Sequence, residues 1–306
     1  MFKKYLKFVL FALGILIIFL LLRKTGLNNF YDVIKGLSIP LLFFAFLSWI
    51  ANLVSSTFRF KKILDPKIKF IELMKIQLWG FLLNYAAAIQ GVGLGAKAGL
   101  LKQRKIKISH SLGSIGSEII YDIISAAFIT IVFSLINIKS LSTLAQSINF
   151  KLIIVACFVL LIFVSIMIFS RKNHHISEIL SKLKNSFNSK KVVTYLSISF
   201  AIWALSALKT FFIFKAAEIN ISYLVVLSTV CVGFIFGLIS MIPGGIGVRE
   251  FIWAHIYSLV GVPINAAISV VVFDRVFSIL SLFIIVISLE GFTHLRKKKA
   301  KNQLAL

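Results

Sequence analysis

The residues best placed to do chemistry are ionisable side chains that interrupt long apolar segments of the chain. Glu118 and Asp122 lie four residues apart, so a helix would place both carboxylates on one face. Charges inside an apolar helix are costly and usually have a function. The two carboxylates would repel each other unless a cation or a proton joins them, and Lys97 and Arg249 are the candidate cations.

Two glycine motifs supply these candidate cations. Gly93-Leu94-Gly95-Ala96-Lys97 recurs 152 residues later as Gly245-Ile246-Gly247-Val248-Arg249, and an aspartate follows the first glycine of each motif after 29 residues. Glycines let the backbone approach a ligand closely and expose amide donors, which suits a phosphate. The second motif is not a nucleotide-binding P-loop, because no Gly-Lys-Ser/Thr follows. The candidate substrate-binding residues are Lys97, Arg249, Gly93, Gly95, Gly244, Gly245, Gly247, Glu118, Asp122, Glu250, Asp274 and Arg275.

Two simpler explanations of these residues stay open. The charges could form interhelical salt bridges that hold the repeats together, and the glycines could form a tight turn between helices. Asp274 and Arg275 are adjacent, so they point in different directions and should have different partners. No nucleophile–base pair or metal-ligand spacing is evident, and Cys157 and Cys231 lie in separate apolar runs. We therefore expect no cofactor and no metal, and a role other than catalysis is favoured.

The elements that must position these residues are membrane-spanning helices. The chain is 59% hydrophobic and only 14% charged, which is outside the range of soluble domains. Its apolar runs are long enough to cross a bilayer as helices and lack the alternation of a barrel. We predict an all-α, polytopic integral membrane bundle with eight apolar elements, at 5–22, 37–57, 71–90, 112–136, 152–170, 192–214, 222–242 and 264–289.

The eight elements form two sets of four. Adding 152 to the bounds of the first four reproduces the second four to within a few residues. We predict one transmembrane domain of two repeats, repeat A at about 1–136 and repeat B at about 152–290, with a basic tail at 291–306. Internal symmetry of this kind is typical of membrane transporters.

The distribution of Lys and Arg predicts the topology. If 71–90 and 222–242 are re-entrant, 25 of the 34 Lys and Arg residues lie on the cytoplasmic side and 7 on the outer side. Both termini are then cytoplasmic in the cell membrane, and each half has three full crossings, so the halves are inverted. The basic segments 58–75, 91–111 and 171–191 are expected to be cytoplasmic loops. The glycines would form the turns of two hairpins that meet near the midplane around a cavity.

At Pro243–Glu250, at Gly93–Lys102 and at the Glu118 and Asp122 pair, the chain resembles the lysylphosphatidylglycerol synthase transmembrane-region family. The resemblance covers essentially the whole chain and implies movement of a phosphate-bearing lipid across the membrane, often beside envelope lipid or glycan synthesis. Only 17 residues follow Leu289, so we expect no aminoacyl-transfer domain and do not infer lysyl transfer.

The leading hypothesis is a flippase-like translocator of an anionic phospholipid or a polyprenyl-phosphate-linked lipid. Lys97 and Arg249 would hold the phosphate from opposite sides. The alternatives are an integral-membrane transferase and a non-transporting partner of an envelope lipid or glycan synthase. Nucleic acid is not an expected partner, because the net charge of +24 is divided among segments between apolar spans.

Overall fold

The computed structural model describes residues 19, 23, 27–64, 68–86, 92–136, 174–187, 189–240 and 245–303. The regular secondary structure of these residues is entirely helical, which confirms the predicted all-α class. The predicted element 152–170, and all of 5–22 except Phe19, lie outside the described residues.

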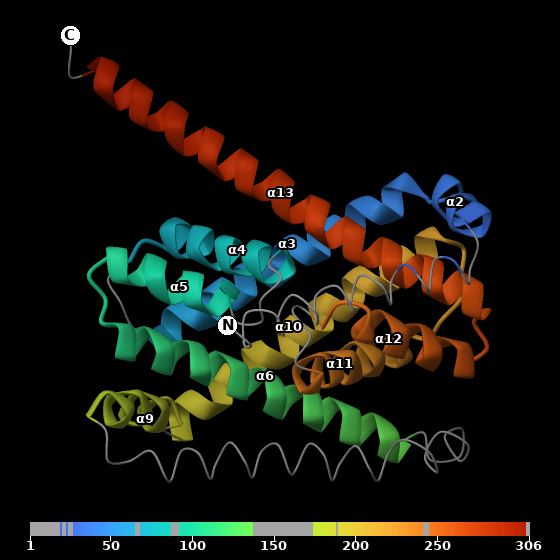
Figure 1. Cartoon of the computed structure of the whole chain (residues 1–306), viewed down its shortest axis with the longest axis horizontal. Coiled ribbons are helices and arrows are strands. Elements are labelled where there is room, and N and C mark those ends of the chain that lie inside the picture. The colour runs from blue at the N-terminus through green and yellow to red at the C-terminus, as the bar shows by residue number, and fades with distance from the viewer. Residues whose placement is uncertain are drawn as a thin grey trace, which may run out of the picture.

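Four long apolar helices form the body of the molecule (Figure 1). Each contains a 26-residue apolar stretch, about 39 Å long, which exceeds a hydrocarbon core of about 30 Å. The chain is therefore a polytopic helical membrane protein. The four helices are α3 (Ile39–Leu64), α6 (Ile108–Ile136), α10 (Ser189–Ala216) and α13 (Ile264–Gln303).

A pair of shorter helices lies between the long helices of each half. In the first half α4 (Phe70–Ala86) packs against α5 (Val92–Gln103), and in the second α11 (Tyr223–Ile239) packs against α12 (Val248–Leu259). The first helix of each pair has 17 residues and the second has 12. Twelve residues extend only about 18 Å, too short to cross a bilayer. Each pair thus has the proportions of a re-entrant hairpin.

Helices α3 and α10, which occupy corresponding places in the two halves, pack antiparallel along their lengths. The Ser38 amide donates to the Ala216 carbonyl at one end, and the Tyr195 hydroxyl donates to the Lys62 carbonyl at the other. Near the middle, the Asn52 amide donates to the Ile202 carbonyl at 2.7 Å. If one half is inverted relative to the other, as predicted, helices in corresponding places run in opposite directions, as α3 and α10 do.

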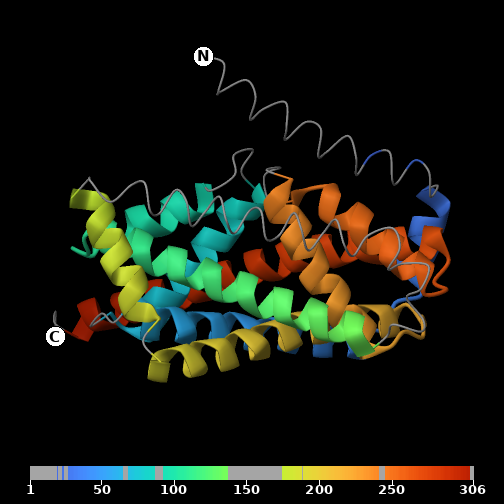
Figure 2. The same ribbon diagram turned by 90° about the horizontal axis from the view of Figure 1, so that it is seen from below.

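Two segments outside the predicted apolar elements are helical, and the second of them lies in the predicted loop 171–191. The first is α2 (Leu27–Lys35), which packs on α13, and the second is α9 (His174–Ser186), which lies along α6 (Figure 2). Helix α9 is held by Tyr121, whose hydroxyl donates to the Ser186 carbonyl. Because α9 carries apolar residues at helical spacing, its apolar side can pack on α6 while Lys184 remains exposed.

The predicted loops 58–75 and 91–111 are also wrong in part. Helix α3 continues to Leu64, and α5 occupies Val92–Gln103. Gly93 and Gly95 therefore lie inside a helix rather than in a turn. Arg59 and Lys97, expected among the charges that flank the spans, are 1% and 3% exposed. Their helices continue into apolar surroundings because carboxylates neutralise both cations.

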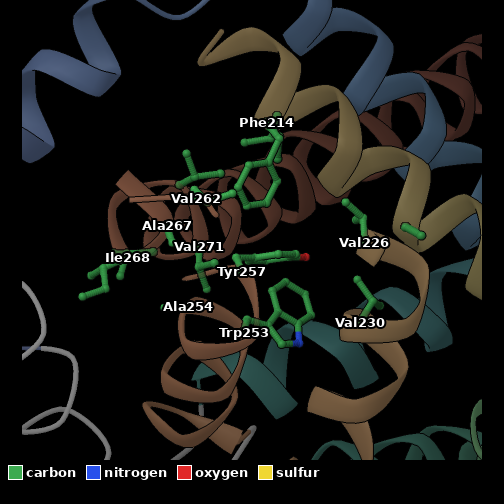
Figure 3. Close-up of a cluster of buried hydrophobic side chains, with 14 of the residues drawn as sticks. Phe214, Val226, Val230, Trp253, Ala254, Tyr257, Val262, Ala267, Ile268 and Val271 are labelled. Atoms are coloured by element: carbon green, nitrogen blue, oxygen red, sulfur yellow. The ribbon is translucent and has the colours of Figure 1, made fainter. Parts of the chain in front are cut away.

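The largest apolar core belongs to the second half. Phe214 of α10 packs edge-to-face on Tyr257 of α12, with ring centroids 4.5 Å apart. Figure 3 shows the Tyr257 ring between Phe214 and Trp253, with Val226 and Val230 of α11 beside them. This core fixes α12 against α10, α11 and α13, and so positions the charges that α12 carries.

Candidate functional site

The first charge cluster consists of Arg59, Lys97, Glu118 and Asp122. The Arg59 guanidinium donates to both carboxylate oxygens of Asp122, at 2.6 and 3.0 Å, and to the Ser199 hydroxyl. Lys97 Nζ lies 2.7 Å from Glu118 Oε2. Two cations balance two carboxylates, so the cluster is neutral.

Glu118 and Asp122 lie on one face of α6, as predicted, and hydrogen-bond donors from several helices reach them. Glu118 also accepts from Gln77 of α4 at 3.0 Å, and its Oε1 lies 3.6 Å from Arg59. The Lys97 ammonium lies over the Phe60 ring, 4.5 Å from its centroid. Buried charges are tolerated when they are paired and hydrogen-bonded, and this cluster meets that condition.

Glycine allows α4 and α5 to approach closely enough to form the cluster. A Cβ on Gly80 of α4 would lie 2.5 Å from Lys97 Cγ, and a Cβ on Gly93 of α5 would clash with the Gly80 carbonyl. The stem of Lys97 therefore lies across a glycine surface on the way to Glu118. A glycine also allows the close approach of the two helices in the second hairpin, since a Cβ on Gly233 of α11 would clash with the Trp253 indole.

The second charge cluster consists of Lys209, Arg249, Glu250, Asp274 and Arg275. Lys209 Nζ lies 2.8 Å from Asp274 Oδ2, and Arg275 Nη1 lies 2.5 Å from Glu250 Oε1. Asp274 and Arg275 thus have different partners, as their adjacency predicts. The Thr210 hydroxyl donates to Asp274 Oδ1. Lys209 Nζ also donates to the Ser278 hydroxyl.

The turn before α12 depends on glycine conformation. Gly245 and Gly247 have φ of +64° and +81°, in the left-handed region. Gly247 is the N-cap of α12, and its amide donates to Glu250 Oε2 at 2.6 Å. Glu250 therefore both caps α12 and ties it to Arg275 of α13. The predicted turn is present here, whereas the first-half glycines lie in α5.

A cavity of about 10 Å³ lies at the second charge cluster, lined by Arg249, Glu250, Trp253, Val271, Asp274, Arg275 and Ser278. That volume holds about one water molecule. Arg249 is partly exposed and its guanidinium lies 4.1 Å from the centroid of the Trp253 ring. The Trp253 indole N–H is buried and has no acceptor within the described parts of the chain. Among the described residues, three cations and two carboxylates gather in this cluster.

The structure places Lys97 and Arg249 in different clusters. Ser199 contacts the first and Lys209 belongs to the second, and these residues are ten positions apart on α10, or about 15 Å. Gly93 belongs to the first hairpin, with Gly95 on its exposed side, while Gly245 and Gly247 form the turn of the second. Gly244 lies outside the described residues.

Sequence reasoning missed the cations that pair with the two aspartates at equivalent motif spacing, which are Arg59 for Asp122 and Lys209 for Asp274. The repeat carried the signal, because Arg59 precedes its aspartate by 63 residues and Lys209 precedes its own by 65. Gly80 and Gly233 were missed similarly, although 153 residues separate them.

Long apolar helices, two pairs of shorter helices and buried charge clusters define a polytopic helical membrane protein. A family model described as the lysylphosphatidylglycerol synthase transmembrane region matches residues 6–286. The chain belongs to that family, as its resemblance implied.

Three archaeal relatives carry the name UPF0104 membrane protein. The protein of Methanothermobacter thermautotrophicus is 31% identical over 120 residues, which cover 36% of each chain. That of Pyrococcus horikoshii is 33% identical over 96 residues, 31% of this chain and 29% of its own. That of Methanocaldococcus jannaschii is 24% identical over 191 residues, 60% of this chain and 82% of its own. The matches thus span about a third of the first two relatives.

Proposed function

We propose that this protein moves a lipid with a phosphate-bearing headgroup across the membrane. The observation that carries the proposal is the cavity at the second charge cluster, which lies among membrane helices and is lined by Arg249, Arg275 and the buried Trp253. Guanidinium groups that line a cavity of this kind suit an anionic ligand. The buried Trp253 N–H offers a further donor to such a ligand.

Arg249 is the residue best placed to meet the headgroup. It is more accessible than Lys209 and Arg275, which are 4% and 8% exposed. Its planar guanidinium can bind two phosphate oxygens at once. The family description supports a lipid as the source of the phosphate, since it names a synthase of a phosphatidylglycerol derivative.

Translocation requires the site to open. A cavity of about 10 Å³ cannot hold a phosphate, so α12 must separate from α13 before a headgroup binds. The Glu250–Arg275 and Asp274–Lys209 pairs close the site in this conformation. In the open state phosphate oxygens would replace carboxylate oxygens on Arg275 and Lys209, and their return would expel the lipid.

The first hairpin provides a corresponding site for the other side of the membrane. Lys97 occupies the place of Arg249 in the repeat, and Asp122 that of Asp274. If the halves are inverted, the two sites open to opposite sides. We propose that the headgroup meets the cations of the two halves in succession, rather than Lys97 and Arg249 together.

The test is lipid translocation by the full chain in proteoliposomes. Labelled phosphatidylglycerol, a polyprenyl phosphate and phosphatidylcholine are compared for wild type, Arg249→Gln, Arg249→Lys and the exposed-lysine control Lys191→Gln. We expect one anionic lipid to move, with movement lost in Arg249→Gln and retained in the control. No movement of any lipid by folded protein would refute the proposal and favour a transferase or a synthase partner.

A further inference from the structure

A groove on the first hairpin has no part in the charge clusters. It measures about 340 Å³ and opens between α4 and α5, where Trp79, Leu83, Ala96, Gly99, Leu100 and Gln103 line it. Five of the six lining residues are apolar or glycine. A Cβ built on Gly99 would meet no atom within 4 Å, so the absence of a side chain there leaves the groove open.

The groove ends beside a basic turn. Gln103 is the last residue of α5, and the exposed residues next to it are Lys102, Arg104 and Lys105. Arg104 lies 3.7 Å from Glu72 of α4, in an exposed ion pair. Further along, Lys107 lies 3.8 Å from Glu178. With these two acids counted, the turn still carries two positive charges.

An apolar groove with a cationic end matches the shape of a lipid anion. We propose that the groove between α4 and α5 binds the hydrocarbon chain of an anionic phospholipid, with its phosphate at Lys102 and Lys105. A hydrocarbon chain on Trp79, Leu83 and Leu100 would gain close van der Waals contact with the groove. A basic side chain at the membrane surface attracts an anionic headgroup, by about five-fold in affinity for each residue.

The site deepens the proposed function, since Lys97 lies on the opposite face of the same short helix. Gly99 faces the groove, while the stem of Lys97 packs on Gly80. A lipid bound in the groove would therefore lie about one helix diameter from the first charge cluster. Binding at this site does not require transport, so the two proposals can fail independently.

Quenching of Trp79 fluorescence tests the proposal directly. The full chain is placed in phosphatidylcholine nanodiscs with increasing phosphatidylglycerol brominated in its acyl chains, and the Trp79 signal is wild type minus Trp79→Phe. We expect half-quenching at a several-fold lower mole fraction than with brominated phosphatidylcholine. Equal quenching by the two lipids would overturn the proposal.

Two variants separate the groove from its basic end. Gly99→Leu should fill the groove and reduce quenching to the level set by bulk lipid, while Ala201→Leu, on an exposed face of α10, should leave it unchanged. Lys102→Gln/Lys105→Gln should remove most of the several-fold preference for phosphatidylglycerol, unlike the exposed control Lys184→Gln/Lys191→Gln. Unchanged quenching in Gly99→Leu would refute the groove. An unchanged preference in the lysine variant would refute its headgroup end.

Discussion

Lys97 and Glu118 form a buried ion pair that joins the short helix α5 to the long helix α6, with Nζ 2.7 Å from Oε2. Their side chains are only 4% and 8% exposed. Replacing one partner of such a pair leaves an isolated buried charge, whereas replacing both partners leaves no buried charge. The pair therefore tests whether the first charge cluster holds the hairpin in place.

Lys97→Met should lower the free energy of unfolding by about 3–5 kcal/mol, because Glu118 loses its nearest cation. The double variant Lys97→Met/Glu118→Gln should recover part of that loss. Unfolding of the purified chain in mixed micelles measures both. Lys107→Met, which breaks an exposed pair with Glu178, should cost less than about 1 kcal/mol. Additive effects of the Lys97 and Glu118 changes would contradict the prediction.

Arg59→Lys should destabilise the protein although it keeps the charge. The guanidinium reaches both Asp122 oxygens and Ser199 at once, and an ammonium cannot reproduce that fork. Loss of one charge-assisted hydrogen bond costs about 1.5–3 kcal/mol. The control is Arg104→Lys at the exposed pair with Glu72, and equal small effects at both positions would show that the fork contributes nothing.

Gly233→Ala should separate α11 from α12, because the new methyl group would overlap the Trp253 indole. Overpacking of this kind costs about 1–3 kcal/mol. Gly95→Ala, with open space around it on α5, should instead be neutral or stabilising by about 0.5–1 kcal/mol. Adding Trp253→Leu to Gly233→Ala should restore part of the stability, and failure of that rescue would show that the clash is not the cause.

Gly247→Ala should strain the turn before α12. The φ of +81° lies in the left-handed region, where a residue with a side chain costs about 1–2 kcal/mol. Because Gly247 also donates to Glu250, a distorted turn should weaken the Glu250–Arg275 pair. Thermal unfolding measures the first effect. Comparison with Glu250→Gln measures the second, since the two changes should then be less than additive.

The sequence predicted the charge pairs less completely than it predicted the helices. Length and hydropathy are sufficient to find α3, α6, α10 and α13, because a membrane admits few alternatives to a long apolar helix. The repeat also placed Asp122 and Asp274 in corresponding positions. Arg59 was assigned to a loop because it begins a basic run, and only packing shows that α3 carries it inward.

The first-half glycines show the same limit. Gly93 and Gly95 share a motif with Gly245 and Gly247, so the same turn was expected for both pairs. Gly93 instead lies in α5, where it serves the close approach to Gly80. One residue type meets both needs, a positive φ and a missing side chain, and spacing along the chain does not distinguish them.

Helix α13 continues unbroken from Ile264 to Gln303 and projects beyond the other helices (Figure 1). From Arg275 to Gln303 its axis is about 42 Å long. A tilt of about 10° at Arg275, as the Glu250 pair opens, would swing the far end through about 7 Å. If the Glu250–Arg275 pair opens as proposed, the continuous helix would act as a lever arm, and holding its far end in place would resist the opening of the second charge cluster.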